Sequence, residues 1–355
     1  MASPLDGIRI LDLSRLLPGP FCTQLLADLG AEVIKIEDPQ GGDYLRWVSP
    51  LLDDGTSVLF HALNRGKKSV TLDLKSADGL KHFRALAAAA DVVVESFRPG
   101  VMEKLGLAPS SLLREFPRLV VCSISGYGQQ GPLRLRAGHD INYVARSGAL
   151  SLMAAPTVLP VQIADLAAGA WPAAMQICAA LVGRARSGVG AIVDVSMKDG
   201  VTGLLSMMLA RTLAGEDVSS GRDLLVGGVP CYGIYATSDG FLAVGALEPK
   251  FWTALCEALA EPELSGRHFD IDARATLAAI FATKSTAHWT QVFASVDACV
   301  EAVLSPAEAL AEARRIEVDI NGRSYAFVSL GLDAAGCTTR APTLGQHNDE
   351  LLHTG

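Results

Sequence analysis

The sequence lacks the local signatures of a disulfide framework, a zinc site and a dinucleotide site. Its seven cysteines are scattered, odd in number and never in a CxxC spacing, so neither paired disulfides nor a metal site is indicated. No GxGxxG follows the first expected strand, so no dinucleotide is indicated. We therefore expect neither a metal nor a dinucleotide cofactor. Scattered, unpaired thiols are typical of a reducing compartment, which favours the cytoplasm.

Runs of like charge and a leader-like N-terminus are also missing. Thirty Lys and Arg stand against 38 Asp and Glu, a formal charge of −8 spread without runs, which argues against a nucleic acid or an anionic membrane as a partner. The first seven residues, MASPLDG, contain no basic segment followed by an apolar one, so no signal peptide is predicted. The apolar stretch 166–183 is interrupted by Gly169 and Pro172. There we expect a tightly packed buried helix and no membrane span.

What is present is an alternation of strand and helix patterns. IRILDL (8–13) predicts a strand, PGP (18–20) opens a helix that ends at Gly30, and AEVIKIE (31–37) predicts the next strand. Such a βαβ unit implies a parallel sheet and an α/β fold. More strands are expected, mostly apolar as in a sheet covered on both faces, at 70–74, 91–96, 119–125 and 192–196.

At 355 residues, of which 50% are hydrophobic, the chain is long enough for two units around a large interior. We expect a large domain over 1–214, a linker and small α+β domain over 215–310, and a return to the large domain over 311–355. The polar, glycine-bounded segment 215–223 is typical of a linker. A hairpin over 232–246 and three helices over 249–295 form the expected small domain.

Two residues at expected helix starts have side chains that can move protons. His139 stands in GHDINY, before a helix expected over 140–150, and the unperturbed pKa of histidine is roughly 6.5. Its structural alternative is a hydrogen-bonded histidine beside Asp140 as an N-cap. Asp165 precedes a long apolar helix, so it is either an N-cap or a general acid, base or nucleophile. The residues alone give each alternative about equal weight.

Glu248 and a set of cations are weaker candidates. Glu248 precedes Pro249 and a helix; it either caps that helix or orients the His139 ring, as a carboxylate does in a triad. Cations follow successive expected strands, where open α/β sheets bind ligands and phosphates need positive charge; a solvated surface is their commoner role. They are Arg65, Lys67, Lys68, Lys75, Arg98 and Lys104.

A series of motifs in one order resembles a known family. The motifs are LDLSRLLPGPFCTQLLADLGAEVIKIE, NRGKKSVTLDLKS, ESFRPGVMEKLGL, SGYGQQGP, AGHDINY, the helix opened by Asp165, GVGAIVDVSMKDG and GALEPKFW. Together they resemble the family III CoA-transferases of the CaiB/BaiF type, and within that group the α-methylacyl-CoA racemases. The resemblance implies a Rossmann-like large domain, a small domain and two chains interlocked as rings. It also implies an acyl-CoA thioester as substrate, with no further cofactor.

The same resemblance assigns roles to residues. In the racemases the residues matching His139 and Asp165 are the catalytic bases on opposite faces of the α-carbon, and the glutamate matching Glu248 supports the histidine from the other subunit. His139 then takes the α-proton of the S isomer and Asp165 returns one to give the R isomer, through an enolate held by backbone N–H groups near Asp140. The implied CoA contacts are Leu72, Asp73, Leu74, Lys75, Ser96, Phe97, Arg98, Lys104, Gly138, Asp140, Ile141, Asn142 and Tyr143.

Some features choose between branches of the family. In the transferases the same aspartate is a nucleophile beneath a glycine-rich loop; this chain has the racemase-like His139 and GALEPKFW and no such loop over 240–265. IEDPQGGD (36–43) is more transferase-like, and Asp38 stands where racemases commonly have a CoA-contacting arginine. Arg46 is a candidate replacement. Lys104 also replaces an arginine, which keeps the charge but loses bidentate geometry.

We therefore predict a 2-methylacyl-CoA racemase, and two alternatives stay open. One is CoA transfer between carboxylic acids with Asp165 as the nucleophile. The other is a non-catalytic acyl-CoA binding protein. The acyl group itself is not indicated. Candidates for an apolar groove, although such residues more often belong to a core, are Leu152, Met153, Leu225, Val226 and Tyr232.

Overall fold

The computed structural model describes residues 3–218, 221, 223–329 and 337–352. These residues form two compact units. The larger unit contains the described residues within Met1–Ser147, Leu159–Leu204 and Ala313–Gly355, and the smaller unit those within Gly148–Val158 and Leu205–Glu312. The chain therefore enters the smaller unit twice, over Gly148–Val158 and Leu205–Glu312, and returns to the larger unit each time.

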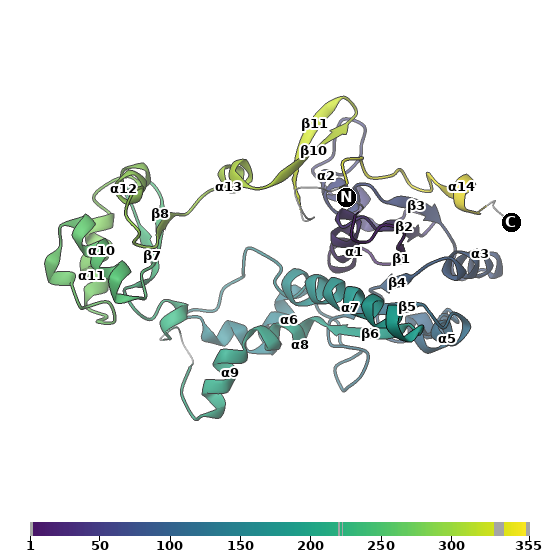
Figure 1. The fold of residues 1–355 in the computed structure, drawn as a ribbon, viewed down its shortest axis with the longest axis horizontal. Helices are drawn as coiled ribbons and strands as arrows, with labels where there is room; N and C mark the ends of the chain where they lie inside the picture. Colours follow the sequence, from purple (N-terminus) through teal and green to yellow (C-terminus); the bar gives the residue numbers. More distant parts are fainter. Residues whose placement is uncertain (1–2, 219–220, 222, 330–336, 353–355) are drawn as a thin grey trace. The chain divides into compact units, whose positions relative to one another are not determined.

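The larger unit is built on a six-stranded parallel sheet in the order β3-β2-β1-β4-β5-β6 (Figure 1). Because the chain adds β2 and β3 on one side of β1 and then β4 on the other, the strand order reverses between β1 and β4. Ligands of open α/β sheets bind outside the carboxyl ends of the strands at such a reversal. The predicted α/β class is confirmed. The strands are β1 (Arg9–Asp12), β2 (Glu32–Glu37), β3 (Lys68–Thr71), β4 (Val92–Glu95), β5 (Val120–Ser125) and β6 (Ala191–Ser196).

Helices cover both faces of this sheet, which explains why its strands are nearly all apolar. On one face Leu11, Ile34 and Val93 share a core with α3 (Ala77–Ala88), α4 (Val101–Lys104) and α5 (Pro109–Glu115). The alternate strand residues, such as Ile10 and Val92, are also fully buried. Helices α1 (Pro18–Asp28) and α7 (Trp171–Ser187) pack against the strands.

The other elements of the larger unit are short. They are α2 (Val58–Asn64), α6 (Asp140–Ser147), α8 (Met197–Leu204), the hairpin of β10 (Arg315–Ile320) and β11 (Arg323–Val328), and α14 (Asn348–Leu352). The end of the chain covers the edge of the sheet, since the Asn348 side chain accepts from the Thr71 backbone N–H and donates to the Thr71 hydroxyl. These hydrogen bonds occupy part of the edge strand β3, which could otherwise pair with a strand of another chain.

Two element boundaries differ from the prediction. The strand expected over 70–74 is β3, which ends at Thr71, paired with the last residue of β2; Leu72 then turns into the core and Asp73 accepts from the Lys75 backbone N–H. The helix expected over 140–150 is α6, which ends at Ser147. The residues after β6 form two helices, α8 and α9 (Ser206–Leu213), because Leu205 departs from helical backbone angles.

Leu166–Ser187 is, in the described part of the chain, the one helical stretch long and apolar enough to cross a membrane. One side of it buries Ala173, Ile177 and Leu181. Its other side exposes Trp171 and Met175, the latter at 65%. An apolar face of α7 is therefore left uncovered within one chain.

The smaller unit packs helices on one face of the antiparallel sheet β7-β8-β9. The strands are β7 (Tyr232–Ala236), β8 (Phe241–Gly245) and β9 (Val300–Ala302), and the helices packed on them are α10 (Pro249–Leu259), α11 (Ala273–Phe281) and α12 (Thr286–Phe293). Helices α9 and α13 (Pro306–Glu312) also belong to this unit. Trp252, Phe281 and Trp289 form the centre of its core. The predicted hairpin and the three helices over 249–295 are confirmed, with ends that differ by one or two residues.

Candidate active site

A cavity of about 350 Å³ opens at the carboxyl ends of β1 and β4, where the strand order reverses. Its walls come from the loops after β1, β4 and β5, from the segment before α6, and from Asp165; all of them belong to the larger unit. Seven of the residues that the sequence nominated line this cavity: Ser96, Phe97, Arg98, Gly138, His139, Tyr143 and Asp165.

His139 is exposed and immediately precedes α6. Its backbone is fixed, because its N–H donates to the Asn142 side chain at 3.0 Å and its carbonyl accepts from the Asn142 N–H at 2.8 Å. Its imidazole has no hydrogen-bond partner among the described residues. The main chain is thus held while the ring is left available to a ligand.

Asp140 does not cap its own helix, so that structural alternative is wrong. Its Oδ1 atom accepts hydrogen bonds from the backbone N–H groups of Ala164 at 2.6 Å and Asp165 at 3.0 Å. The carboxylate of Asp140 therefore joins the start of α6 to the segment that carries Asp165.

Asp165 is not an N-cap either. It has helical backbone angles, φ −67° and ψ −46°, and its side chain caps no N–H group. It opens a single π-helical turn, η3 (Leu166–Ala170), in which the Ala170 N–H donates to the Asp165 carbonyl at 2.9 Å. Pro172, which has no N–H to donate, follows this turn. Isolated π turns are frequent at functional sites.

The environment of Asp165 raises the pKa of its side chain toward neutral pH. Burial, and then the negative charge of Asp140, raise the pKa of Asp165 to about 6, while His139 opposes them. A carboxyl group with such a pKa is present in both protonation states near pH 6 and can donate or accept a proton.

The Tyr143 side chain packs against Gly126 and Gly138, which both line the cavity. Its hydroxyl donates to the Gly138 carbonyl at 2.5 Å. Its ring leaves no room for a side chain at either glycine. A Cβ atom added to Gly126 would lie 2.3 Å from Tyr143 Cε1, and one added to Gly138 would lie 2.7 Å from the same atom. Burial raises the pKa of Tyr143 to about 12, so the phenol stays neutral. Glycine at position 138 is therefore needed for His139 to stand where it does.

Four guanidinium groups face the cavity: those of Arg15, Arg98, Arg134 and Arg136. None of them forms an ion pair with a carboxylate of the described residues, so their charge is available to an anionic ligand. Sequence reasoning found only Arg98. The available signal for the others was position: SRLL (14–17) lies one residue after β1, and LRLRAGHD places two arginines just before His139.

The other predicted CoA contacts do not line this cavity. Leu72 is buried in the core, Asp73, Leu74 and Lys75 follow β3, Lys104 ends α4, and Ile141 and Asn142 are exposed on α6. Arg46 is fully engaged: it pairs with Glu37 at 2.6 Å, donates to the Pro342 carbonyl and stacks on Phe60. These partners argue against Arg46 as the replacement for the arginine missing at position 38.

Glu248 precedes α10 in the smaller unit, is exposed and caps no N–H group. The capping alternative is therefore wrong for Glu248 as well, and its carboxylate is left for another role.

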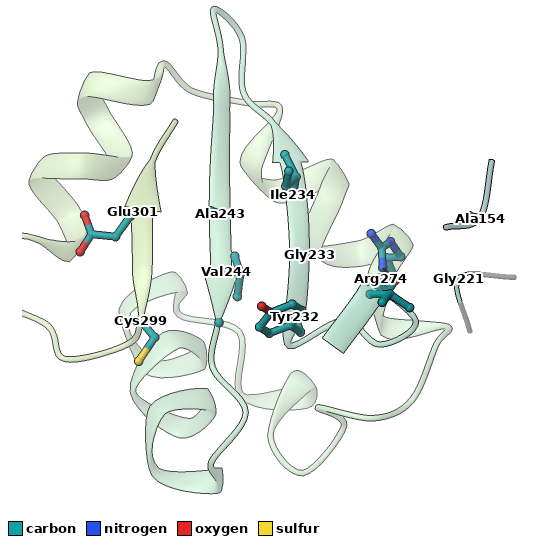
Figure 2. Close-up of a pocket in the computed structure, with 13 residues that line it drawn as sticks. Ala154, Gly221, Tyr232, Gly233, Ile234, Ala243, Val244, Arg274, Cys299 and Glu301 are labelled. Carbon is teal, nitrogen blue, oxygen red and sulfur yellow. Dashed lines mark hydrogen bonds between the residues drawn. The ribbon is translucent and has the colours of Figure 1, made fainter. Parts of the chain in front are cut away.

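The smaller unit contains a second cavity, of about 750 Å³, against the outer face of β7 and β8. Figure 2 shows Arg274 at one end of this face and Cys299 and Glu301 at the other, with Tyr232 and Ala243 between them. Of the residues predicted to line an apolar groove, Val226 and Tyr232 do so here. Leu152, Met153 and Leu225 do not.

These features define an α/β protein in which a histidine and a carboxyl group of raised pKa line one arginine-rich cavity. The pattern of CoA-transferase family III matches residues 5–348, and the chain belongs to that family.

Relatives with two different activities are similar to the chain. An alpha-methylacyl-CoA racemase of Homo sapiens is 38% identical, and the match covers 98% of the chain and 92% of that protein. A succinyl-CoA:glutarate CoA-transferase of Mus musculus is 36% identical over 82% of the chain and 70% of that protein. The crystal structure of a CAIB/BAIF family protein from Brucella suis superimposes with a TM-score of 0.84 at 29% identity, covering 99% of the chain and 98% of that chain.

Proposed function

We propose that the protein is a racemase that interconverts the R and S isomers of 2-methylacyl-CoA thioesters. The observation that carries this proposal is that His139 and Asp165 line one cavity and that the pKa of Asp165 is raised to about 6. Racemisation needs two proton carriers at one carbon, one protonated and one not. An imidazole can take and return a proton near neutral pH, and a carboxyl group with such a pKa can do the same.

In this mechanism His139 takes the α-proton of one isomer and Asp165 delivers a proton to the opposite face. The thioester carbonyl becomes an enolate between these steps and needs hydrogen-bond donors. The backbone N–H groups of Asp140 and Ile141, in the first turn of α6, donate to no acceptor among the described residues. We assign them to the enolate oxygen; one such donor is worth about 2.7–4 kcal/mol in the transition state.

The arginines provide the attraction for the CoA portion. Arg15, Arg98, Arg134 and Arg136 line the cavity and pair with no carboxylate of the described residues, and guanidinium groups bind phosphates bidentately. This set compensates for Asp38, which stands where racemases commonly have an arginine. Leu72–Lys75 and Lys104 are proposed to contact parts of CoA that extend beyond the cavity.

We also propose that two chains form an interlocked homodimer, each with a Rossmann-like large domain. The uncovered apolar face of α7, with Trp171, Met175 and Val182, supports a partner there, because faces of this kind mark protein interfaces. In the dimer Glu248 of one chain would orient His139 of the other, which fits a carboxylate that forms no cap at α10, the helix it precedes.

The decisive test is incubation of a single 2-methylacyl-CoA isomer with the enzyme in deuterium oxide. We expect deuterium at the α-carbon and loss of optical purity at matched rates, and both should be abolished by His139→Ala and by Asp165→Ala. Wild-type rates in the two variants would overturn the assignment.

CoA transfer between carboxylic acids is the alternative, because relatives named as transferases match about three quarters of the chain. It needs Asp165 as a nucleophile that forms an acyl anhydride. That activity predicts hydroxylamine-sensitive acylation of Asp165 and movement of CoA to an added acid, with little dependence on His139. An α-label without CoA movement supports the racemase; CoA movement without an α-label supports the transferase. Binding with neither result would identify a non-catalytic acyl-CoA binding protein.

A further inference from the structure

Leu16 lines the candidate active-site cavity in a conformation that leucine rarely adopts. Its φ is +63°, in the left-handed region, and its side chain is 42% exposed. In that region the Cβ atom of an L-residue is crowded, so a residue other than glycine needs external contacts to stay there. The contacts that hold Leu16 are therefore part of how the cavity wall is built.

The main contact is Asp43, which follows β2. Both oxygens of its carboxylate accept from the Leu16 backbone N–H, at 3.1 and 3.3 Å. Asp43 is itself fixed, since Oδ1 accepts from the Leu45 N–H at 3.0 Å and its own N–H donates to Glu37 at 3.0 Å. The residue is 1% exposed. A charged acceptor buried in this way makes a strong hydrogen bond.

Lys35 supports the same loop from two directions. It is fully buried in β2, and its ammonium lies 2.9 Å from Asp43 Oδ2 while it also donates to the Ser14 carbonyl at 2.9 Å. Between these two points the Arg15 N–H donates to the Ser96 hydroxyl at 3.4 Å. The buried Lys35 ammonium therefore binds both Ser14, two residues before Leu16, and Asp43, whose carboxylate accepts from the Leu16 N–H.

We infer that Asp43, held by Lys35, is a positioning residue for the candidate active site: it keeps Leu16 left-handed and so fixes the cavity wall formed by Arg15–Leu17. The kinetic side of this inference rests on the proposed racemase function. Asp43 touches no reacting atom and acts through Leu16.

The test is Asp43→Asn made in three backgrounds: wild type, Leu16→Ala and Leu16→Gly. Alanine keeps the Cβ atom and the crowding, whereas glycine adopts positive φ without penalty. We expect Asp43→Asn to lower kcat/KM for α-proton exchange about tenfold in the wild-type and Leu16→Ala backgrounds. In the Leu16→Gly background the loss should shrink to about twofold or less, a coupling that a double-mutant cycle measures. Asp53→Asn, on an exposed loop, is the matched control.

A readout that does not depend on activity separates this inference from the proposed function. Exchange of the Leu16 amide with deuterium oxide should accelerate in Asp43→Asn, while the amides of Ile10 and Leu11 in β1 stay protected. An equal loss of kcat/KM in all three backgrounds, or a Leu16 amide that exchanges at the wild-type rate, would overturn the inference and leave Asp43 as a residue of the core. If the wild-type enzyme exchanges no α-proton but the Leu16 amide responds as expected, the racemase proposal fails and the positioning role stands.

Discussion

Asp140 accepts a hydrogen bond from the backbone N–H of Asp165 at 3.0 Å, and its negative charge raises the pKa of the Asp165 side chain. One carboxylate therefore orients the segment that carries the candidate acid and also tunes that acid. Residues that set a catalytic pKa without touching the substrate are expected beside such groups.

The first prediction concerns Asp140→Asn. Asparagine keeps Oδ1 as an acceptor for the two N–H groups but removes the charge that raises the pKa of Asp165. The pKa of Asp165 should therefore fall, and the limb of the pH profile of kcat/KM that this carboxyl group sets should move to lower pH. Rates of α-deuterium incorporation measured between pH 5 and 9 check this. A profile that changes in height alone would show that Asp140 acts only by orientation.

The second prediction concerns stability. The native pKa of Asp165, about 6, lies above the ordinary value of 3.8, so the native state binds more protons than the unfolded state between these values. The contribution of Asp165 to stability is therefore greatest below pH 4 and is lost as the pH rises through 6.

Asp165→Asn resembles the protonated acid at every pH. It should raise the free energy of unfolding at pH 7.5 by roughly 1–3 kcal/mol and leave it nearly unchanged at pH 4. Urea denaturation at the two pH values measures the difference. Asp199→Asn is the control: Lys198 lowers the pKa of Asp199, so that variant should be slightly less stable than wild type at pH 7.5. Equal effects of Asp165→Asn at both pH values would contradict the assigned pKa.

The third prediction concerns the arginines of the cavity. Arg98→Ala and Arg136→Ala should each raise KM for the acyl-CoA by about fivefold with a small change in kcat, because they bind substrate equally in the ground and transition states. The effect should shrink at high salt, since these exposed charges are screened. Arg114→Ala, exposed on α5 away from the cavity, should leave KM unchanged. A KM that is insensitive to salt would argue against phosphate contacts here.

The sequence predicted those parts of the site that are local in the chain. Strand and helix alternation gave the parallel sheet, and GHDINY and the aspartate before the long helix gave His139 and Asp165. It could not separate a capping aspartate from a chemical one, because both have the same neighbours. The distinction arises from the π turn after Asp165 and from Asp140, which lies 25 residues earlier in the chain.

The features it missed depend on contacts between distant segments. An arginine in a loop has the same local pattern whether it faces solvent or a ligand, so Arg15, Arg134 and Arg136 were not distinguished. The left-handed Leu16 has no local signal, because Asp43 and Lys35 impose it. Lys35 did offer a clue: it is the one cation within the apolar strand AEVIKIE, where a buried charge requires a partner.

The fourth prediction concerns Gly138. A Cβ atom there would lie 2.7 Å from Cε1 of Tyr143, so Gly138→Ala must displace the ring or the main chain before His139. We expect loss of most α-proton exchange activity, since a displacement of about 1 Å costs on the order of a hundredfold in rate.

Gly183→Ala is the matched control for Gly138→Ala. Gly183 lies within α7 with open space around its Cβ position, so alanine there should stabilise the helix and keep activity. Full activity in Gly138→Ala would mean that the site tolerates a shifted Tyr143.

The fifth prediction tests whether the proposed site draws on two chains. His139→Ala and Glu248→Gln should each be nearly inactive as pure proteins, since one removes a proton carrier and the other leaves its ring without an orienting carboxylate. If Glu248 of one chain serves His139 of the other, a mixed dimer of the two variants contains one doubly altered site and one wild-type site. Because half of randomly assembled dimers are mixed, co-expression should restore about a quarter of wild-type activity.

The chains must be produced together, because interlocked rings do not exchange subunits. Purification through two different tags isolates the mixed dimer, for which the expected activity is about half of wild type. A mixed dimer as inactive as its parents would place both residues in the same chain's site.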